Sequence, residues 1–65
     1  MKLTINGETK EIEAATVAEA LAVLDLGDAR VATALNGQFV PADARPGTEL
    51  SPGDTLEILS PMQGG

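Results

Sequence analysis

The sequence predicts an α+β domain in which a small sheet packs on one helix. Two Asn-Gly pairs, at 6–7 and 36–37, each lie between short segments of alternating apolar and polar residues, as in β-hairpins. A helix-start pattern separates the two hairpins, and one further strand pattern follows the second. Because two hairpins flank a single helix, we expect the sheet to cover one face of that helix.

The first hairpin is predicted from the alternation on both sides of Asn6-Gly7. Leu3 and Ile5 alternate with polar residues, which is the period of a half-buried strand. Asparagine and glycine both tolerate a positive φ, so the pair favours a tight turn. Residues 9–13 are then expected to return as the second strand.

A short helix is predicted from residue 17 to about residue 25. Thr16 and Glu19 have the spacing of a capping box, in which the hydroxyl accepts a first-turn N–H and the carboxylate reaches back to the Thr16 N–H. Apolar residues follow at helical spacing: Val17, Ala20, Leu21 and Leu24. Gly27 is expected to end the helix.

The second hairpin is predicted over residues 31–35 and 38–40, joined by the second Asn-Gly turn. Pro41 ends it. Residues 42–51 contain Pro46 and Gly47 and are interpreted as an irregular crossing loop, anchored to the core by Leu50.

The last strand is predicted over residues 55–59, with Leu56 and Ile58 facing the core. A last strand beside the first would be parallel to it and central, giving a mixed sheet of four to five strands. The sequence thus predicts one domain over residues 1–60 and a flexible tail over residues 61–65.

Composition excludes several classes of function. The chain has 65 residues, ten acidic against four basic residues, and a net charge of −6, which disfavours binding to nucleic acid. It has no cysteine and no histidine, so a disulfide or a Cys/His zinc site is excluded. It has no membrane-spanning apolar run and no signal-peptide pattern, and we expect a cytoplasmic protein without membrane contact.

Catalysis by the chain itself is not expected. Ser51 and Ser60 have no histidine to act as a base. We interpret the acidic residues that could be paired as solvated surface groups, because so short a chain leaves little room for a pocket. These residues are Glu11, Glu13, Asp25, Asp28, Asp43, Asp54 and Glu57.

The C-terminus is the remaining candidate for chemistry. The chain ends in Gly64-Gly65, which have no side chains to obstruct a narrow channel. Met62 and Gln63 before them add an adaptable apolar contact and uncharged reach, so we expect residues 62–64 to thread into a partner. A carboxylate reacts only once it carries a good leaving group such as AMP. We therefore expect no bound cofactor and a separate enzyme that uses ATP.

A docking face for a partner is predicted on the open side of the sheet. If the alternating residues of the second hairpin face the helix, Phe39, Leu59 and Ala34 lie on the opposite face. An exposed aromatic residue beside aliphatic ones often marks an interface. The alternative is that Phe39, the only aromatic residue of the chain, packs in the core.

The chain resembles the ThiS family, the sulfur carriers of thiamine biosynthesis, which have the ubiquitin-like β-grasp fold. The resemblance covers nearly the whole length. It rests on the segments MKLTINGE, TVAEAL, VATALNGQFVP and PGDTLEILSPMQGG. The ALNGQFVP segment and the SPMQGG tail together are the more specific part, since other ubiquitin-like proteins also end in Gly-Gly.

The resemblance implies a sequence of partners. An E1-like adenylating enzyme would activate the Gly65 carboxylate with ATP, and sulfur from a cysteine desulfurase route would convert it to a thiocarboxylate. Thiazole synthase would then take the sulfur. Gly64 corresponds to the required slim neighbour, and Phe39 and Leu59 to docking residues. We expect a monomer in the free state and no catalytic residue in the chain.

One loop departs from the family pattern. Ala42-Asp43-Ala44, with Arg45 after it, follows Pro41 where family members often have a basic or larger residue. This difference bears on partner contacts and leaves the carboxylate chemistry untouched. Two alternatives stay open from the sequence: a carrier that serves molybdopterin or another pathway, and a ubiquitin-like interaction module with an inert tail.

Overall fold

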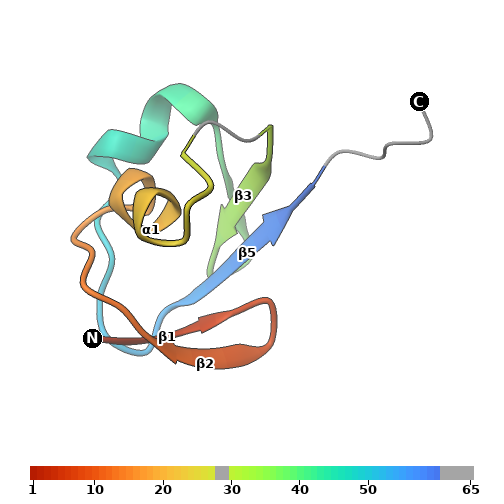
Figure 1. The fold of residues 1–65 in the computed structure, drawn as a ribbon. Helices are drawn as coiled ribbons and strands as arrows, with labels where there is room; N and C mark the ends of the chain where they lie inside the picture. Colours follow the sequence, from red (N-terminus) through yellow and green to blue (C-terminus); the bar gives the residue numbers. More distant parts are fainter. Residues whose placement is uncertain (28–29, 61–65) are drawn as a thin grey trace.

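The computed structural model describes residues 1–27 and 30–60. The elements in chain order are β1 (Lys2–Ile5), β2 (Glu8–Glu11), α1 (Val17–Val23), β3 (Ala32–Leu35), β4 (Gln38–Val40), the 3₁₀ helix η1 (Ala42–Gly47) and β5 (Thr55–Leu59). The five strands form one sheet, and α1 and η1 lie on the same side of it (Figure 1). The α+β class and the mixed sheet packed on one helix are confirmed.

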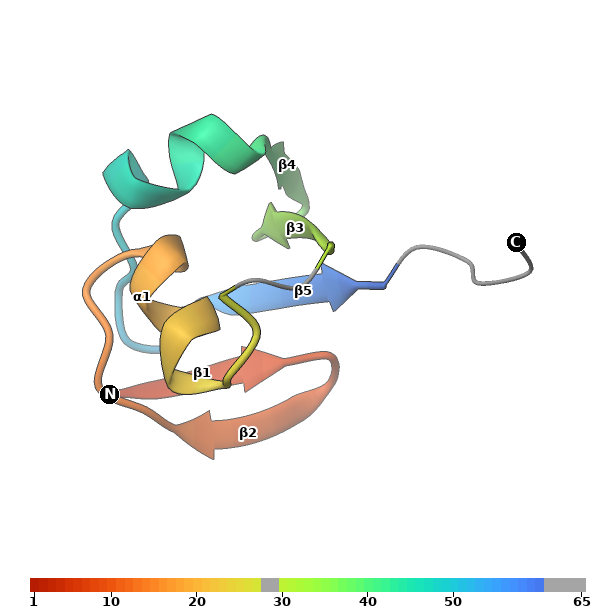
Figure 2. The same cartoon turned by 45° about the horizontal axis from the view of Figure 1, so that its top comes forward.

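The last strand occupies the centre of the sheet, as predicted. The strand order is β2-β1-β5-β3-β4, and β5 runs parallel to β1 and antiparallel to β3. Figure 2 shows β5 between these two neighbours. The two hairpins therefore meet only through β5, which makes this strand the structural link between the halves of the sheet.

Both Asn-Gly pairs form the predicted hairpin turns. Asn6 and Asn36 have φ values of 52° and 51°, and the glycines that follow them have φ values of 86° and 85°. Two successive positive φ values are the mark of a type I′ turn, whose twist matches that of the flanking strands. The turn residues thus determine both hairpins locally.

The side chains of the same two asparagines bind β5. Asn6 Nδ2 donates to the carbonyl oxygen of Ile58 at 3.0 Å, and the Ile58 N–H donates to Asn6 Oδ1 at 2.8 Å. Asn36 Oδ1 accepts the N–H of Thr55 at 2.9 Å. Each turn therefore adds a side-chain rung that ties its hairpin to the central strand.

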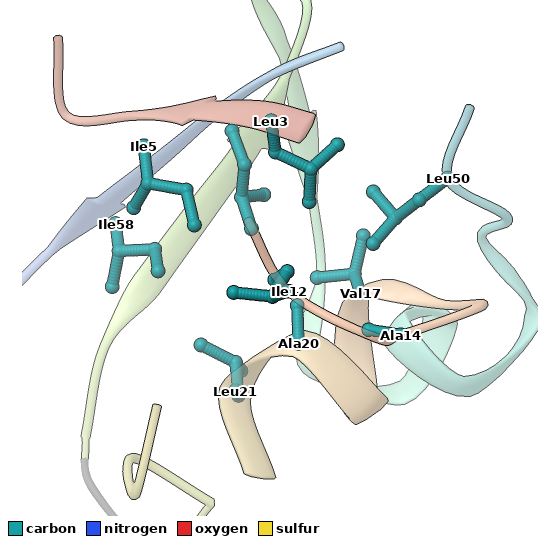
Figure 3. Packing of buried hydrophobic residues seen from close by; sticks show 10 residues of the cluster. Leu3, Ile5, Ile12, Ala14, Val17, Ala20, Leu21, Leu50 and Ile58 are labelled. Carbon is teal, nitrogen blue, oxygen red and sulfur yellow. The ribbon is translucent and has the colours of Figure 1, made fainter. Parts of the chain in front are cut away.

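The core lies between the sheet and α1 (Figure 3). The largest side chains that are fully buried are those of Leu3, Leu56, Val17 and Thr33. Leu50 is buried as well, so its predicted anchoring role is confirmed. The ten apolar residues of the cluster are Leu3, Ile5, Ile12, Ala14, Val17, Ala20, Leu21, Leu50, Leu56 and Ile58.

The capping box at the start of α1 differs from the prediction in one bond. Thr16 Oγ1 accepts the N–H of Glu19 at 3.2 Å, as expected. The Glu19 carboxylate, however, accepts the N–H of Ala15 at 2.8 Å rather than that of Thr16. The segment that enters the helix pairs with a neighbouring strand-like stretch, since the Leu50 N–H donates to the Ala15 oxygen at 2.9 Å. This pairing brings the Ala15 N–H within reach of Glu19.

The helix ends at Val23, earlier than predicted, and Gly27 is not its stop. Asp25 takes the left-handed conformation with φ 63°. Its N–H donates to the Ala22 oxygen at 3.0 Å, and the Leu26 N–H donates to the Leu21 oxygen at 2.7 Å. This pair of bonds defines a Schellman motif, which usually has glycine at the left-handed position. Aspartate occupies it here because short polar side chains tolerate that conformation.

The segment after β4 is more regular than the predicted loop. Residues 42–47 form η1, and the Thr48 hydroxyl donates to the Ala44 oxygen at 2.8 Å. Arg45 Nε donates to Thr33 Oγ1 in β3 at 3.2 Å, and Arg45 Nη2 donates to the oxygen of Val31, which directly precedes β3. The regular 3₁₀ conformation of residues 42–47 is thus accompanied by a hydrogen bond to β3, a strand outside that segment.

The remaining strand bounds agree with the predictions to within two residues. The second strand begins at Glu8 and ends at Glu11 instead of covering residues 9–13, yet Ile12 is buried as expected. Within the described parts of the chain, none of the helices has the length and apolar character needed to cross a membrane.

Candidate functional site

The predicted reacting group lies outside the described residues. Gly65 and Gly64 belong to the segment 61–65, as do the predicted threading residues Gln63 and Met62. The description ends at Ser60, one residue after β5. Ser60 follows directly on β5, the central strand of the sheet (Figure 1). The last described residue is therefore attached to the middle of the sheet rather than to a peripheral loop.

The predicted docking residues lie together on the open face of the sheet. Phe39 is 69 % exposed and Leu59 is 66 % exposed, so the alternative of a buried Phe39 is wrong. Phe39 is directly opposite Ala34 in the β3–β4 ladder, and Leu59 is directly opposite Ala32 in the β3–β5 ladder. Side chains at such positions are neighbours, about 5 Å apart at Cβ.

These four residues, Phe39, Ala34, Ala32 and Leu59, are called the apolar face below. Its charged neighbour is Glu57, which is exposed and directly opposite Ala34. The sequence prediction missed Ala32 as a member of this face. The signal was available, because Ala32 precedes Ala34 by two residues and so shares its side of the strand.

Most acidic residues that the structure describes lie on the surface of the protein. Glu11, Glu13, Asp25, Asp43 and Glu57 are all exposed, as predicted, and Asp28 lies outside the described residues. Among residues 1–27 and 30–60, no group of three or more potential ligands could hold a metal ion.

Asp54 is the exception to the surface prediction, because it is half-buried in a turn. Its Oδ2 accepts the N–H of Ser51 at 2.8 Å, and its Oδ1 accepts Asn36 Nδ2 at 3.1 Å. Both oxygens are engaged in shaping the approach to β5, which gives this carboxylate a structural role.

The Met1 amino group and the Glu11 carboxyl group have shifted pKa values, and both lie at the opposite end of the sheet from the apolar face. The Met1 amino group lies 2.9 Å from Glu11 Oε2 and 3.5 Å from Glu13 Oε2. The hydrogen bond to Glu11 raises the pKa of the amino group, and the same bond lowers the pKa of Glu11. These groups lie at the start of β1, whereas Leu59 lies at the end of the parallel strand β5, so the ion pair is remote from the apolar face.

Comparison with known proteins identifies the chain. A model of the ThiS family matches residues 3–65, which includes the Gly-Gly terminus. The chain belongs to the ThiS family. The resemblance predicted from the sequence is therefore confirmed over almost the whole chain.

Two solved structures support the assignment to the ThiS family. A crystal structure of the thiamine biosynthesis protein ThiS from Geobacter metallireducens is 35 % identical, with a TM-score of 0.83 and 100 % of both chains covered. A solution structure of a thiamine biosynthesis protein from the same organism is 33 % identical, with a TM-score of 0.80, and covers 100 % of this chain and 88 % of that chain. A comparison with functionally curated proteins gave no match.

Membership of the ThiS family has two consequences. The mixed sheet with its single helix is a β-grasp fold, as the resemblance implied. The membership also supports a role as a sulfur carrier in thiamine biosynthesis. The apolar face is the candidate surface for contact with partner enzymes in sulfur transfer.

Proposed function

We propose that the chain carries sulfur as a thiocarboxylate on Gly65 for the formation of the thiazole ring of thiamine. The observation that carries the proposal is the family match, which extends through Gly64 and Gly65. The composition agrees with it, because a chain without cysteine or histidine offers few other groups for covalent chemistry.

The chemistry requires a partner that activates the carboxylate. A carboxylate oxygen of Gly65 attacks the α-phosphate of ATP and releases pyrophosphate, which leaves an acyl adenylate. The terminal sulfur of a persulfide, delivered from a cysteine desulfurase route, then attacks the carbonyl carbon and expels AMP. A thiol cleaves the resulting acyl disulfide, which releases the thiocarboxylate on Gly65 and leaves a disulfide as the oxidised product. The chain supplies only the carbonyl, so an E1-like adenylating enzyme binds the ATP, and thiazole synthase accepts the sulfur.

The apolar face supports docking to such an enzyme. An aromatic side chain that is 69 % exposed beside Ala34 offers apolar area that a partner can bury. This face includes the end of β5, so a partner seated on it also lies next to the start of the tail. We propose that the same face serves the adenylating enzyme and positions the tail for entry into its active site.

Thiazole formation is favoured over the other pathways. The matching family and both solved neighbours are thiamine biosynthesis proteins, whereas the tail chemistry alone would fit a carrier for molybdopterin equally well. The choice of acceptor can be tested directly by offering the loaded carrier to thiazole synthase and to molybdopterin synthase and measuring which one removes the sulfur.

Intact-protein mass spectrometry tests the carboxylate chemistry. The chain is incubated with ATP, the adenylating enzyme of the same organism and a sulfur source. We expect a mass increase that matches one oxygen-to-sulfur exchange, and its loss when Gly65 is deleted or when one residue is added after it. Circular dichroism of both variants checks that the domain is still folded.

A negative result has a defined meaning in this assay. If the wild-type chain gains no sulfur from an enzyme that is active on another carrier, the proposal is wrong. An interaction module with an inert tail would then be the better description, and its partner binding would survive deletion of Gly64 and Gly65.

A further inference from the structure

A pocket of about 540 Å³ lies where β3 begins and β5 ends. Its walls come from three elements and include Arg30, Val31, Ala42, Arg45 and Leu59. Its volume falls within the range of about 300–1,000 Å³ that is typical of binding pockets. The lining also includes Ser60, so the pocket adjoins the point where the tail leaves the domain.

Hydrogen bonds to Thr33 and Val31 hold Arg45, one of the two arginines of the pocket, in place. Arg45 donates from Nε to the Thr33 hydroxyl at 3.2 Å and from Nη2 to the Val31 oxygen. Thr33 is 1 % exposed, and its hydroxyl donates in turn to the Val40 oxygen at 2.9 Å. These bonds use only part of the guanidinium, which carries further N–H groups for an anionic partner. Little side-chain entropy remains to be lost when such a partner binds.

The charge at this pocket is unusual for the chain. The protein has ten acidic and only four basic residues, and two of those four line the pocket. In the part of the chain that the structure describes, the ion pairs involve Met1 and Lys10, and neither Arg30 nor Arg45 forms one with a described residue. A positive site on an acidic protein selects for a carboxylate on the partner.

The pocket is continuous with the apolar face. Ala32 and Leu59 belong to both, because they form the pair that ends the β3–β5 ladder and they also line the pocket. A partner that covers Phe39 and Ala34 therefore has a path to the pocket over Ala32 and Leu59. Glu57 lies within the β3–β5 ladder and is negative, whereas the pocket at the end of the ladder is positive. This charge difference can fix the orientation in which a charged partner binds.

We propose that this pocket receives an aspartate or glutamate side chain, with an adjoining apolar residue, from the adenylating enzyme. The inference rests on the proposed function, since it concerns the enzyme that this function requires. The carboxylate pairs with Arg30 and Arg45, and the apolar neighbour packs on Leu59 and Val31. The contact fixes the orientation of the docked carrier at the base of its tail.

Charge reversal with a matched control tests the pocket. Arg30→Glu reverses a charge at the pocket, and Lys2→Glu makes the same change in net charge at the far end of the sheet. Both residues are exposed, so both variants should fold. Calorimetry with the adenylating enzyme should show a Kd at least about tenfold higher for Arg30→Glu and nearly unchanged for Lys2→Glu. Arg30→Lys should keep most of the affinity.

The salt dependence and a second variant complete the test. The difference between Arg30→Glu and the wild type should shrink as the ionic strength rises, because the lost pair is electrostatic. Arg45→Gln should also weaken binding, with thermal unfolding recorded to confirm that it is folded. An acidic-to-arginine change on the enzyme that restores binding of Arg30→Glu identifies the carboxylate.

The outcomes separate this inference from the proposed function. If Arg30→Glu and folded Arg45→Gln bind as tightly as the wild type, the pocket is not used and the inference is overturned. The mass shift at Gly65 in the wild type would still stand in that case. If the wild type shows no mass shift, the proposed function fails and the inference falls with it.

Discussion

The two hairpins of the sheet are built in the same way and serve different ends. Each turns at an Asn-Gly pair with nearly equal φ values, and each directs its asparagine side chain to β5. Their outer strands differ. All four residues of β2 are exposed and three of them are charged, whereas β4 combines a buried Val40 with an exposed Phe39.

This difference separates a charged edge strand from the proposed binding surface. Charged residues on an edge strand discourage pairing with other chains, and β2 has this composition. The strand β4 is short and ends before Pro41, and its exposed aromatic residue points to the open face. Identical turn chemistry therefore fixes the hairpin geometry, while the residues at outward positions decide what each hairpin presents to solvent.

The largest expected effect concerns the two asparagine side chains. Asn6→Gly keeps the left-handed turn but leaves the N–H and carbonyl of buried Ile58 without the side-chain partner. We expect a loss of about 2 kcal/mol in unfolding free energy, against about 1 kcal/mol for Asn36→Gly, whose side-chain bonds are exposed. Urea denaturation of both variants measures the difference.

The comparison between Asn6→Gly and Asn36→Gly cancels the effect of glycine on the entropy of the unfolded chain. Glycine increases the entropy of the unfolded chain by a similar amount at both positions. Equal losses for the two variants would mean that the burial of the Asn6 bonds has no energetic weight, and the two turns would then be equivalent in energy as well as in geometry.

The next effect concerns the surface that β4 presents. Phe39→Thr should weaken binding to the adenylating enzyme at least about tenfold, because an exposed aromatic residue is a typical hot spot. The unfolding free energy should change by less than about 0.5 kcal/mol, since threonine keeps the strand preference. Calorimetric binding and thermal unfolding measure the two quantities.

Gln38→Thr is the matched control for Phe39→Thr. Gln38 precedes Phe39 on the same strand and is exposed, but its side chain lies on the opposite side of the strand. It should leave the affinity unchanged. Equal weakening by both variants would point to a general effect on β4 and contradict the specific role of the apolar face.

A smaller change in stability is expected at Asp25, where the backbone preference can be tested separately from side-chain hydrogen bonds. Asp25 is a left-handed residue like the two turn asparagines, but it directly follows Leu24, the C-cap residue of α1. Asp25→Gly should stabilise the fold by about 0.5 kcal/mol, because glycine occupies this conformation without steric cost. A rise in melting temperature would show the opposite sign to the asparagine variants, and a fall would indicate that the Asp25 side chain stabilises the helix end.

The smallest effect is expected at the N-terminal ion pair, which lies beside the β1–β2 hairpin. The pKa of Glu11 is lowered from 4.5, so its contribution is present above that pH and is lost as the pH falls through the folded value. The pKa of the Met1 amino group is raised from 8.0, so its contribution is present below that pH and is lost as the pH rises through the folded value.

Glu11→Gln tests this pH window. The stability difference from the wild type should be largest between pH 4.5 and 8.0 and should shrink outside it. Glu8→Gln removes a more distant pair, in which Lys10 Nζ lies 3.6 Å from Glu8, and serves as the control. Urea midpoints across the pH range would refute the pair's role if Glu11→Gln differed from the wild type equally at every pH.

The local elements could be predicted because their signals are local. The turns at Asn6 and Asn36 depend on residue types that tolerate a positive φ, and the strand alternation of Leu56 and Ile58 depends on which face is buried. The same alternation favoured an exposed Phe39, but the alternative of core packing was excluded only by the structure. These features need no knowledge of distant contacts.

The errors occurred where distant segments meet. The Glu19 carboxylate binds Ala15 in a segment that pairs with Leu50, which is remote in the sequence. Residues 42–47 form η1, which Arg45 connects by one hydrogen bond to Thr33 in β3 and by another to Val31 just before that strand. No sequence pattern within those segments predicts the Glu19–Ala15 hydrogen bond or the hydrogen bonds of Arg45.

The sequence by itself determined the order of the five strands and α1, the two hairpin turns and the buried face of each strand. The tertiary structure decided that the asparagine side chains hold β5 from both sides, and that Arg30 and Arg45 meet Leu59 in one pocket. The physical reason is the distance along the sequence over which each interaction acts. Backbone preferences and alternation act between neighbours, whereas side-chain hydrogen bonds and pockets form only after the sheet has brought separate segments together.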